Sequence, residues 1–151
     1  MTLQFDTVTD AISKLTVAAL KIKDIDEIPV EGGKSRQALL IPKPVDFMTD
    51  VSMVRKSFGG GSSAKMDFCY VITYRLLYKP IGDGRSNILA PYPQLIAMIR
   101  AIWDAILAID VFPGCEDIIP AGISMVGPTE DPTGVLYWGA DFSFRIMEFV
   151  E

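Results

Sequence analysis

The chain has 151 residues, the ordinary length of one domain, and half of them are hydrophobic. Its 14 basic and 19 acidic residues give a net charge of −5, which argues against general nucleic-acid binding, because such binding depends on Lys and Arg at phosphates. Histidine is absent, which excludes Ser-His-Asp and Cys-His catalytic pairs and removes the usual acid or base near neutral pH.

The hydrophobic content is high for a solitary domain of this length, with a mean hydropathy of +0.31. Small domains leave much surface exposed, so the surplus predicts surfaces that are buried between subunits. We expect no signal peptide and no membrane span, since the longest apolar stretch, Leu95–Ile109, is short and is interrupted by Arg100 and Asp104. Cys69 and Cys115 are expected to be free thiols, because two isolated cysteines do not make a disulfide scaffold.

The N-terminal segment has the pattern of an amphipathic helix. Thr7 and Asp10 have the spacing of a capping box, which opens helices. Apolar residues recur with a 3.6-residue period at Phe5, Val8, Ile12, Leu15, Ala19 and Ile22. This period predicts a helix as far as Ile22 with one face on a sheet.

A short strand is predicted after the helix, at Gln37–Ile41, where two prolines, Pro42 and Pro44, limit it. The stretch between helix and strand, Lys23–Gly33, is acidic and irregular and indicates no function.

Val51–Phe58 and Met66–Lys79 have the pattern of the two arms of a long hairpin. One face of the second arm is formed by Phe68, Tyr70, Ile72, Tyr74, Leu76 and Tyr78, with a period of two that is typical of a strand. Between the arms lies Gly59–Lys65, whose three glycines and two serines cannot hold one conformation alone. We hypothesise that Ser57–Met66 is mobile in the free chain and ordered in an assembly, which amide hydrogen exchange of the two forms would test.

A second helix is predicted from Pro93 to Ile109, because proline suits the first helical position. Its larger apolar side chains are Leu95, Met98, Ile99, Ile102, Trp103, Ile106 and Ile109. The opposite side carries Ala97, Ala101, Ala105 and Ala108. A helix this apolar is expected to be buried on more than one side, and its small residues would let another element approach closely.

Two more strands are predicted in the last third of the chain. Asp110–Gly122 has the composition of a loop, Ile123–Val126 that of a short strand and Gly127–Gly134 that of a polar turn. Val135–Val150 is the last strand and alternates between apolar and polar residues. The alternation inverts near Met147, which predicts a bulge there or an edge with both faces contacted.

These elements predict one domain, residues 1–151, of the α+β class, in the order α-β-β-β-α-β-β. Its mainly antiparallel sheet would carry two helices on one face and a long hairpin with a glycine-rich tip.

Known site motifs do not match this sequence, so we expect no catalytic residue, no cofactor site, no metal site and no enzymatic activity. A phosphate loop reads GxxxxGK[ST] and opens a helix, whereas Lys65 is followed by Met66 and a strand. The acidic turns lack EF-hand spacing, and Cys69 and Cys115 form no CxxC pair. The tyrosines of the long strand could stack on bases, but their apolar neighbours favour packing in a core or interface.

The combined pattern resembles the tail terminator, or tail completion, proteins of long-tailed bacteriophages. The resemblance covers most of the chain and consists of the element order, the Tyr-rich strand with its glycine-rich tip, the Pro-led apolar helix and the closing strand. In the closing strand, Tyr137–Ile146 reads Tyr-Trp-Gly-Ala-Asp-Phe-Ser-Phe-Arg-Ile.

The resemblance implies a ring, a hexamer in that family, on the head-proximal end of the tail tube of the virion, assembled in the host cytoplasm. Such a ring stops tube polymerisation and offers the docking surface for the head connector. The implied partners are further copies of the chain, the tail tube protein and the connector or stopper protein, while phage DNA passes through the lumen without sequence-specific binding.

The predicted assembly-interface residues lie at the hairpin tip and at the end of the last strand. They are Ser57, Phe58, Gly59, Gly60, Gly61, Ser62, Ser63, Ala64, Lys65, Met147 and Phe149. Two alternatives stay open: another neck or head-tail connector completion protein, and a small ligand-binding α+β module. Light scattering separates the last one, because a ligand-binding module predicts a monomer or dimer with ligand-dependent melting.

Overall fold

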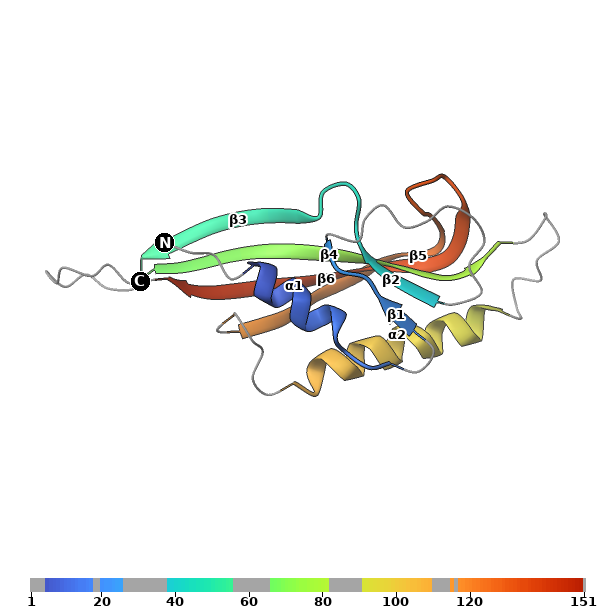
Figure 1. Cartoon of the computed structure of the whole chain (residues 1–151), viewed down its shortest axis with the longest axis horizontal. Helices are drawn as coiled ribbons and strands as arrows, with labels where there is room; N and C mark the ends of the chain where they lie inside the picture. Colours follow the sequence, from blue (N-terminus) through green and yellow to red (C-terminus); the bar gives the residue numbers. More distant parts are fainter. Residues whose placement is uncertain are drawn as a thin grey trace, which may run out of the picture.

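The computed structural model describes residues 5–17, 20–25, 38–55, 66–81, 91–109, 115 and 117–150. The elements in these residues are α1 (Phe5–Ser13), β1 (Leu20–Ile22), β2 (Ala38–Pro42), β3 (Met48–Arg55), β4 (Met66–Pro80), α2 (Pro91–Leu107), β5 (Asp117–Glu130) and β6 (Leu136–Val150). The strands form a single sheet in the order β1-β2-β4-β6-β5, with β3 also paired to β4. Its long strands run side by side along the molecule (Figure 1).

β4 and β6 form the antiparallel centre of the sheet. Their pairing runs from Met66 opposite Val150 to Pro80 opposite Tyr137, with one irregularity between Leu77 and Lys79. β2 and β3 both lie on the other side of β4, β2 beside its C-terminal part and β3 beside its N-terminal part. β5 lies beyond β6, so β3 and β5 are at opposite edges of the sheet.

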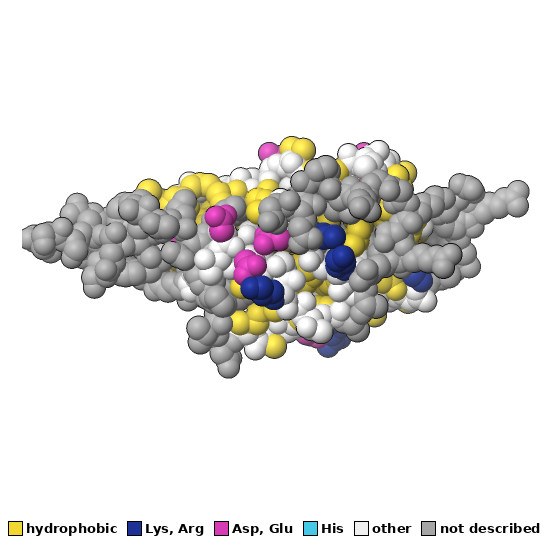
Figure 2. All heavy atoms as spheres, viewed as in Figure 1, with side chains coloured by type: hydrophobic (Ala, Val, Ile, Leu, Met, Phe, Trp, Pro, Cys, Tyr) yellow, Lys and Arg dark blue, Asp and Glu magenta, His cyan; other side chains and the backbone are white. Residues whose placement is uncertain are grey.

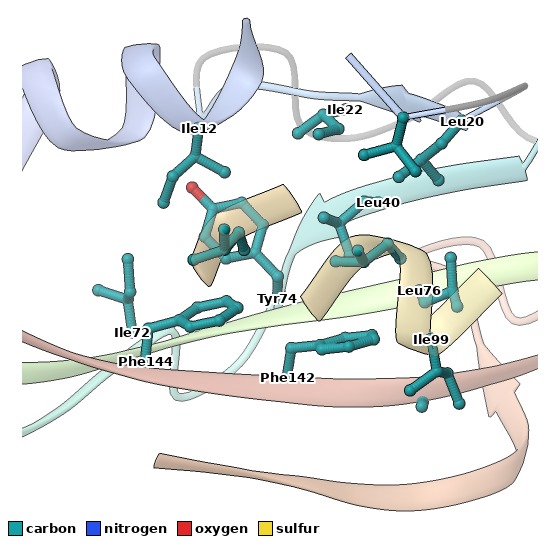
Figure 3. Close-up of a cluster of buried hydrophobic side chains, with 14 of the residues drawn as sticks. Ile12, Leu20, Ile22, Leu40, Ile72, Tyr74, Leu76, Ile99, Phe142 and Phe144 are labelled. Atoms are coloured by element: carbon teal, nitrogen blue, oxygen red, sulfur yellow. The ribbon is translucent and has the colours of Figure 1, made fainter. Parts of the chain in front are cut away.

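The main core lies between one face of this sheet and the two helices. Ile12 of α1 and Ile99 of α2 belong to the same buried cluster as Tyr74 of β4 and Phe142 of β6 (Figure 3). Trp103 of α2 adds tilted ring contacts with the two phenylalanines of β6, Phe142 and Phe144, at centroid distances of 6.3 and 5.8 Å. The predicted α+β class, with a mainly antiparallel sheet and helices on one face, is confirmed.

The first helix is shorter than its periodicity predicted. It ends at Ser13, Leu20 and Ile22 lie in β1 instead, and Thr7 lies inside the helix rather than at a cap. β1 pairs in parallel with β2, opposite Ala38, Leu39 and Leu40. Ile22 fits the helical period only by coincidence. Leu20, Lys21 and Ile22 are buried, exposed and buried in turn, which is the alternation of a strand.

The strand before the last one is longer than predicted. β5 begins at Asp117 and includes Pro120, which the composition had assigned to a loop, and it continues through Pro128. Proline cannot donate a hydrogen bond to a neighbouring strand, so it is tolerated where a strand has only one partner. β5 pairs only with β6 among the described strands, which explains the prolines.

No bulge occurs near Met147 in the last strand. The register with β4 is continuous from Val150 to Gly139. Glu148 keeps its place in the alternation and lies on the helix side of the sheet, 1% exposed, where its carboxylate accepts a hydrogen bond from the Tyr70 hydroxyl at 3.0 Å. The apparent inversion is therefore a buried polar residue in a regular strand, and the bulge prediction was wrong.

Candidate assembly surfaces

Among the predicted interface residues, the structure describes Met147 and the backbone of Phe149. Ser57–Lys65 lies outside the described residues. Met147 lies in β6 between two partners, opposite Cys69 of β4 and Asp117 of β5, and its side chain is half-buried on the face away from the helices. The backbone of Phe149 pairs with Asp67 of β4. Met147 is thus in the interior of the sheet rather than at an edge.

The β3 edge is one surface with exposed apolar side chains. Val51 is 53% and Met53 43% exposed, and β3 pairs only with β4 among the described strands. A bulge lies between Thr49 and Ser52, where Asp50 has a positive φ of 51°. Figure 2 shows hydrophobic side chains along the margin where Figure 1 places β3. Among the described residues, this edge offers apolar contacts together with strand backbone that no second strand pairs with.

The β5 edge is a second apolar surface, on the opposite side of the sheet. Ile119 is 42%, Ile123 38% and Val126 39% exposed. The strand is interrupted by two register shifts, between Pro120 and Gly122 and between Ser124 and Gly127. Prolines and bulges blunt an edge against continuous backbone pairing. A partner at this edge therefore meets mainly side chains.

The outer face of α2 is a third surface with apolar side chains. The helix packs over β4 and β6 with Leu95, Ile99, Ile102 and Ile106, which are buried. The opposite side carries Ile96 and Leu107, 45% and 55% exposed. It also carries exposed Ala97, Ala101 and Ala108. The expectation that α2 is buried on more than one side is thus unmet within a single chain.

The far face of the sheet holds an ion-pair cluster with a structural role. The Asp141 carboxylate is 2% exposed and accepts two hydrogen bonds from Arg75, Nε to Oδ1 at 2.9 Å and Nη2 to Oδ2 at 3.2 Å. Lys43 Nζ lies 3.8 Å from Oδ2, and Arg75 Nη1 also donates to the carbonyl oxygen of Glu130 at 3.3 Å. The bidentate geometry commits the guanidinium to Asp141 and ties β4 to β6.

Two buried or half-buried groups near one end of the core, Tyr70 and Cys115, have raised pKa values. Burial raises the pKa of the Tyr70 hydroxyl, and the negative charge of Glu148 and its hydrogen bond raise it further. Burial also raises the pKa of the Cys115 thiol to about 11, with added effects of Glu148 and Asp117. Both groups therefore stay protonated near neutral pH, which makes Cys115 a poor nucleophile.

Sequence reasoning missed the edge residues. The composition of Asp110–Gly122 predicts a loop at Ile119, and the pattern around Met53 predicts only an arm of a hairpin. The signal present for β5 is the proline that directly follows the apolar pair Ile118 and Ile119, because proline within a strand is confined to edges and bulges. The exposure of Ile96 and Leu107 had no such signal, because periodicity alone does not reveal which side of an apolar helix faces the sheet.

Within the part of the chain that the structure describes, no helix has the length and hydrophobicity needed to cross a membrane, and no group of potential ligands is arranged around a metal position. No protein-family model matches the sequence, and a search of curated proteins found no match.

Proposed function

We propose that the chain is a structural assembly protein of the tail-terminator kind, which forms a closed ring, a hexamer by analogy, on the head-proximal end of a phage tail tube. In this role it stops tube polymerisation and provides the surface on which the head connector docks. The observation that carries the proposal is the presence of two different apolar edges, β3 and β5, on opposite sides of one sheet.

Opposite and unlike edges are what a ring requires. A closed ring is built from heterologous contacts, in which one surface of each copy meets a different surface of the next. Met53 at one edge and Ile123 at the other lie on the same face of the sheet as the helices, since they stand opposite Phe68 and Phe142, respectively. Their burial against a neighbour would cover part of the hydrophobic surplus.

The proposal is tested with one variant at each edge, Met53→Lys and Ile123→Lys. Both side chains are exposed in the single chain, so the folds should remain intact by circular dichroism, whereas each lysine would be buried without a partner in a ring. We expect wild type to form a ring by light scattering, alone or on tail tubes, and each variant to lose it. Thr16→Lys, at an exposed position after α1, is the control that should keep the ring.

Mixing the two variants distinguishes a heterologous contact from a symmetric one. Met53→Lys keeps an intact β5 edge and Ile123→Lys keeps an intact β3 edge, so an equimolar mixture should reach a higher mass than either variant alone, without closing a ring. Ring formation by both single variants would overturn the proposal. So would a wild-type chain that forms no ring either alone or on tubes.

A further inference from the structure

The exposed residues on the outer face of α2 are arranged symmetrically about the middle of the helix. Arg100 and Asp104 lie at its centre, with side chains 85% and 67% exposed and a distance of 3.9 Å from Arg100 Nε to Asp104 Oδ2. An exposed pair at this distance contributes little to stability, so either charge can take another partner at small cost. The two charges also cancel, in a chain whose net charge is −5.

Helix geometry places the other side chains of this face in two rows. Each residue advances by about 100° and about 1.5 Å along the axis. Ile96 and Leu107 therefore share one flank, about 9 Å below and about 8 Å above the level of Ile102. Ala97 and Ala108 share the other flank at nearly the same two heights.

These heights match when α2 is placed against an antiparallel copy of itself, with the two-fold axis at the level of Ile102. Ile96 then meets Leu107 of the second copy, and Leu107 meets Ile96. On the other flank, Ala97 meets Ala108 of the second copy, and two small side chains allow the helices to approach closely. In the centre, Arg100 faces Asp104 of the second copy and Asp104 faces Arg100. Large residues meet large ones, small meet small, and opposite charges meet.

We propose that the outer face of α2 is a self-association surface, on which a second copy of this chain binds in antiparallel orientation about a two-fold axis. The match of residue types about the two-fold axis points to a second copy as the partner. Binding of an unrelated protein would not require apolar, small and charged positions on this face to match one another in this way. The contact is isologous, unlike the heterologous edge contacts of a ring, so it does not rest on the proposed function. It would pair free chains, or join two rings.

The first test uses charge reversal in the Ile123→Lys background, in which the β5 edge is blocked and only the α2 contact is measured. Sedimentation equilibrium should show a dimer for this background. Arg100→Asp alone and Asp104→Arg alone should each weaken dimerisation by about tenfold or more, because like charges then face each other across the contact. The double variant Arg100→Asp/Asp104→Arg should restore it, since both cross-pairs re-form.

A second test uses disulfide trapping and does not depend on affinity. With Ile96→Cys and Leu107→Cys in one chain, oxidation should give covalent dimers, while intrachain closure is prevented by a separation of about 17 Å along the helix. Each single cysteine variant should stay uncross-linked, as should wild type, whose Cys69 is buried and whose Cys115 is half-buried.

Three results would overturn the proposal: a monomer at every concentration in the Ile123→Lys background, a double charge reversal as weak as the single reversals, or cross-linking of a single cysteine variant, which would indicate parallel helices. None of these outcomes bears on whether the wild-type chain forms a ring through β3 and β5.

Discussion

Tyr70 and Tyr74 show how two like residues on one strand face acquire different energetic roles. Both are fully buried on the helix side of β4. The Tyr70 hydroxyl donates to Glu148 at 3.0 Å, whereas the Tyr74 hydroxyl has no hydrogen-bond partner among the described residues. The Tyr74 ring packs edge-on against Phe47 at a centroid distance of 5.6 Å. Its apolar body thus contributes to the core while its hydroxyl carries a desolvation cost.

Removing the two hydroxyls should therefore affect the free energy of unfolding differently. Tyr70→Phe is expected to lower the free energy of unfolding by about 1–3 kcal/mol, because the buried Glu148 carboxylate loses a donor. Tyr74→Phe is expected to be neutral or to raise it by about 1 kcal/mol, because an unsatisfied buried hydroxyl is removed. Urea unfolding followed by tryptophan fluorescence measures both. Equal destabilisation by the two variants would contradict this account.

At the scale of elements, the amino-acid composition of β6 follows from the two faces of the sheet on which its residues lie. Trp138, Ala140, Phe142 and Phe144 are buried in the core, while Asp141 on the other face binds Arg75. Ser143 lies 3.1 Å from the Thr73 hydroxyl, and Arg145 is exposed. The residues named here from the stretch Trp138–Arg145 are thus explained by their positions in this sheet. The proposed function accordingly depends on the sheet edges rather than on this strand.

Gly139 is the position in this strand that tolerates no side chain. A Cβ there would overlap the carbonyl oxygen of Leu76 and lie 2.6 Å from Oγ1 of Thr129. Gly139→Ala is therefore expected to lower the free energy of unfolding by about 3 kcal/mol, since the backbone of β4 must shift. Arg145→Ala, on the same strand but exposed, should change it by less than about 0.5 kcal/mol. Similar urea midpoints for the two variants would contradict this expectation, because they would show that the β4 backbone can move away from residue 139 at little energetic cost.

At the scale of the whole molecule, the main core lies on the helix side of the sheet, a smaller buried cluster contains Leu39, Ile41, Leu77 and Tyr137, and three described surfaces carry exposed apolar side chains. Two are the unlike edges β3 and β5, and the third is the outer face of α2. Unlike edges suit a ring, whereas a helix face with a two-fold register suits a pair. Part of the high hydrophobic content of the chain thus lies on exposed surfaces, two suited to a ring contact and one suited to a two-fold contact.

Alkaline pH should destabilise the whole fold. The pKa values of Cys115, Tyr70 and Tyr74 are raised above their ordinary values of 9.0 and 10.0, so the folded state holds these protons more tightly than the unfolded state. The associated stability is complete below pH 9 and is lost as pH rises, first through Cys115 and then through the tyrosines. Between pH 9 and 11 we expect Cys115 to account for about 1–2 kcal/mol, discounted for its partial exposure.

Urea unfolding at pH 8, 9, 10 and 11 measures this loss, with Cys115→Ala as the matched variant. The variant should lose less stability than wild type between pH 9 and 11, whatever its stability at pH 8. Parallel pH profiles for the two proteins would show that the thiol does not carry this part of the loss.

The sequence by itself determined the long strands β4 and β6, the helix α2, the hairpin pairing of β3 with β4 and the α+β class. It could do so because the period of apolar residues records which face of an element is buried. The period does not record what an element pairs with. Parallel pairing of β1 with β2 ended the first helix early, and an unpartnered edge allowed Pro120 inside β5.

Only the tertiary structure decided the residues on which the proposals and the stability predictions depend. The buried Glu148 carboxylate accepts a hydrogen bond from Tyr70, 78 positions away in the chain, and no local pattern contains that contact. Met53 and Ile123 are exposed because β3 and β5 each pair with one strand among the described residues, and Leu107 is exposed because α2 turns only one side to the core. Burial depends on which elements meet, and so the free apolar surfaces became identifiable only after the strands had been placed in order.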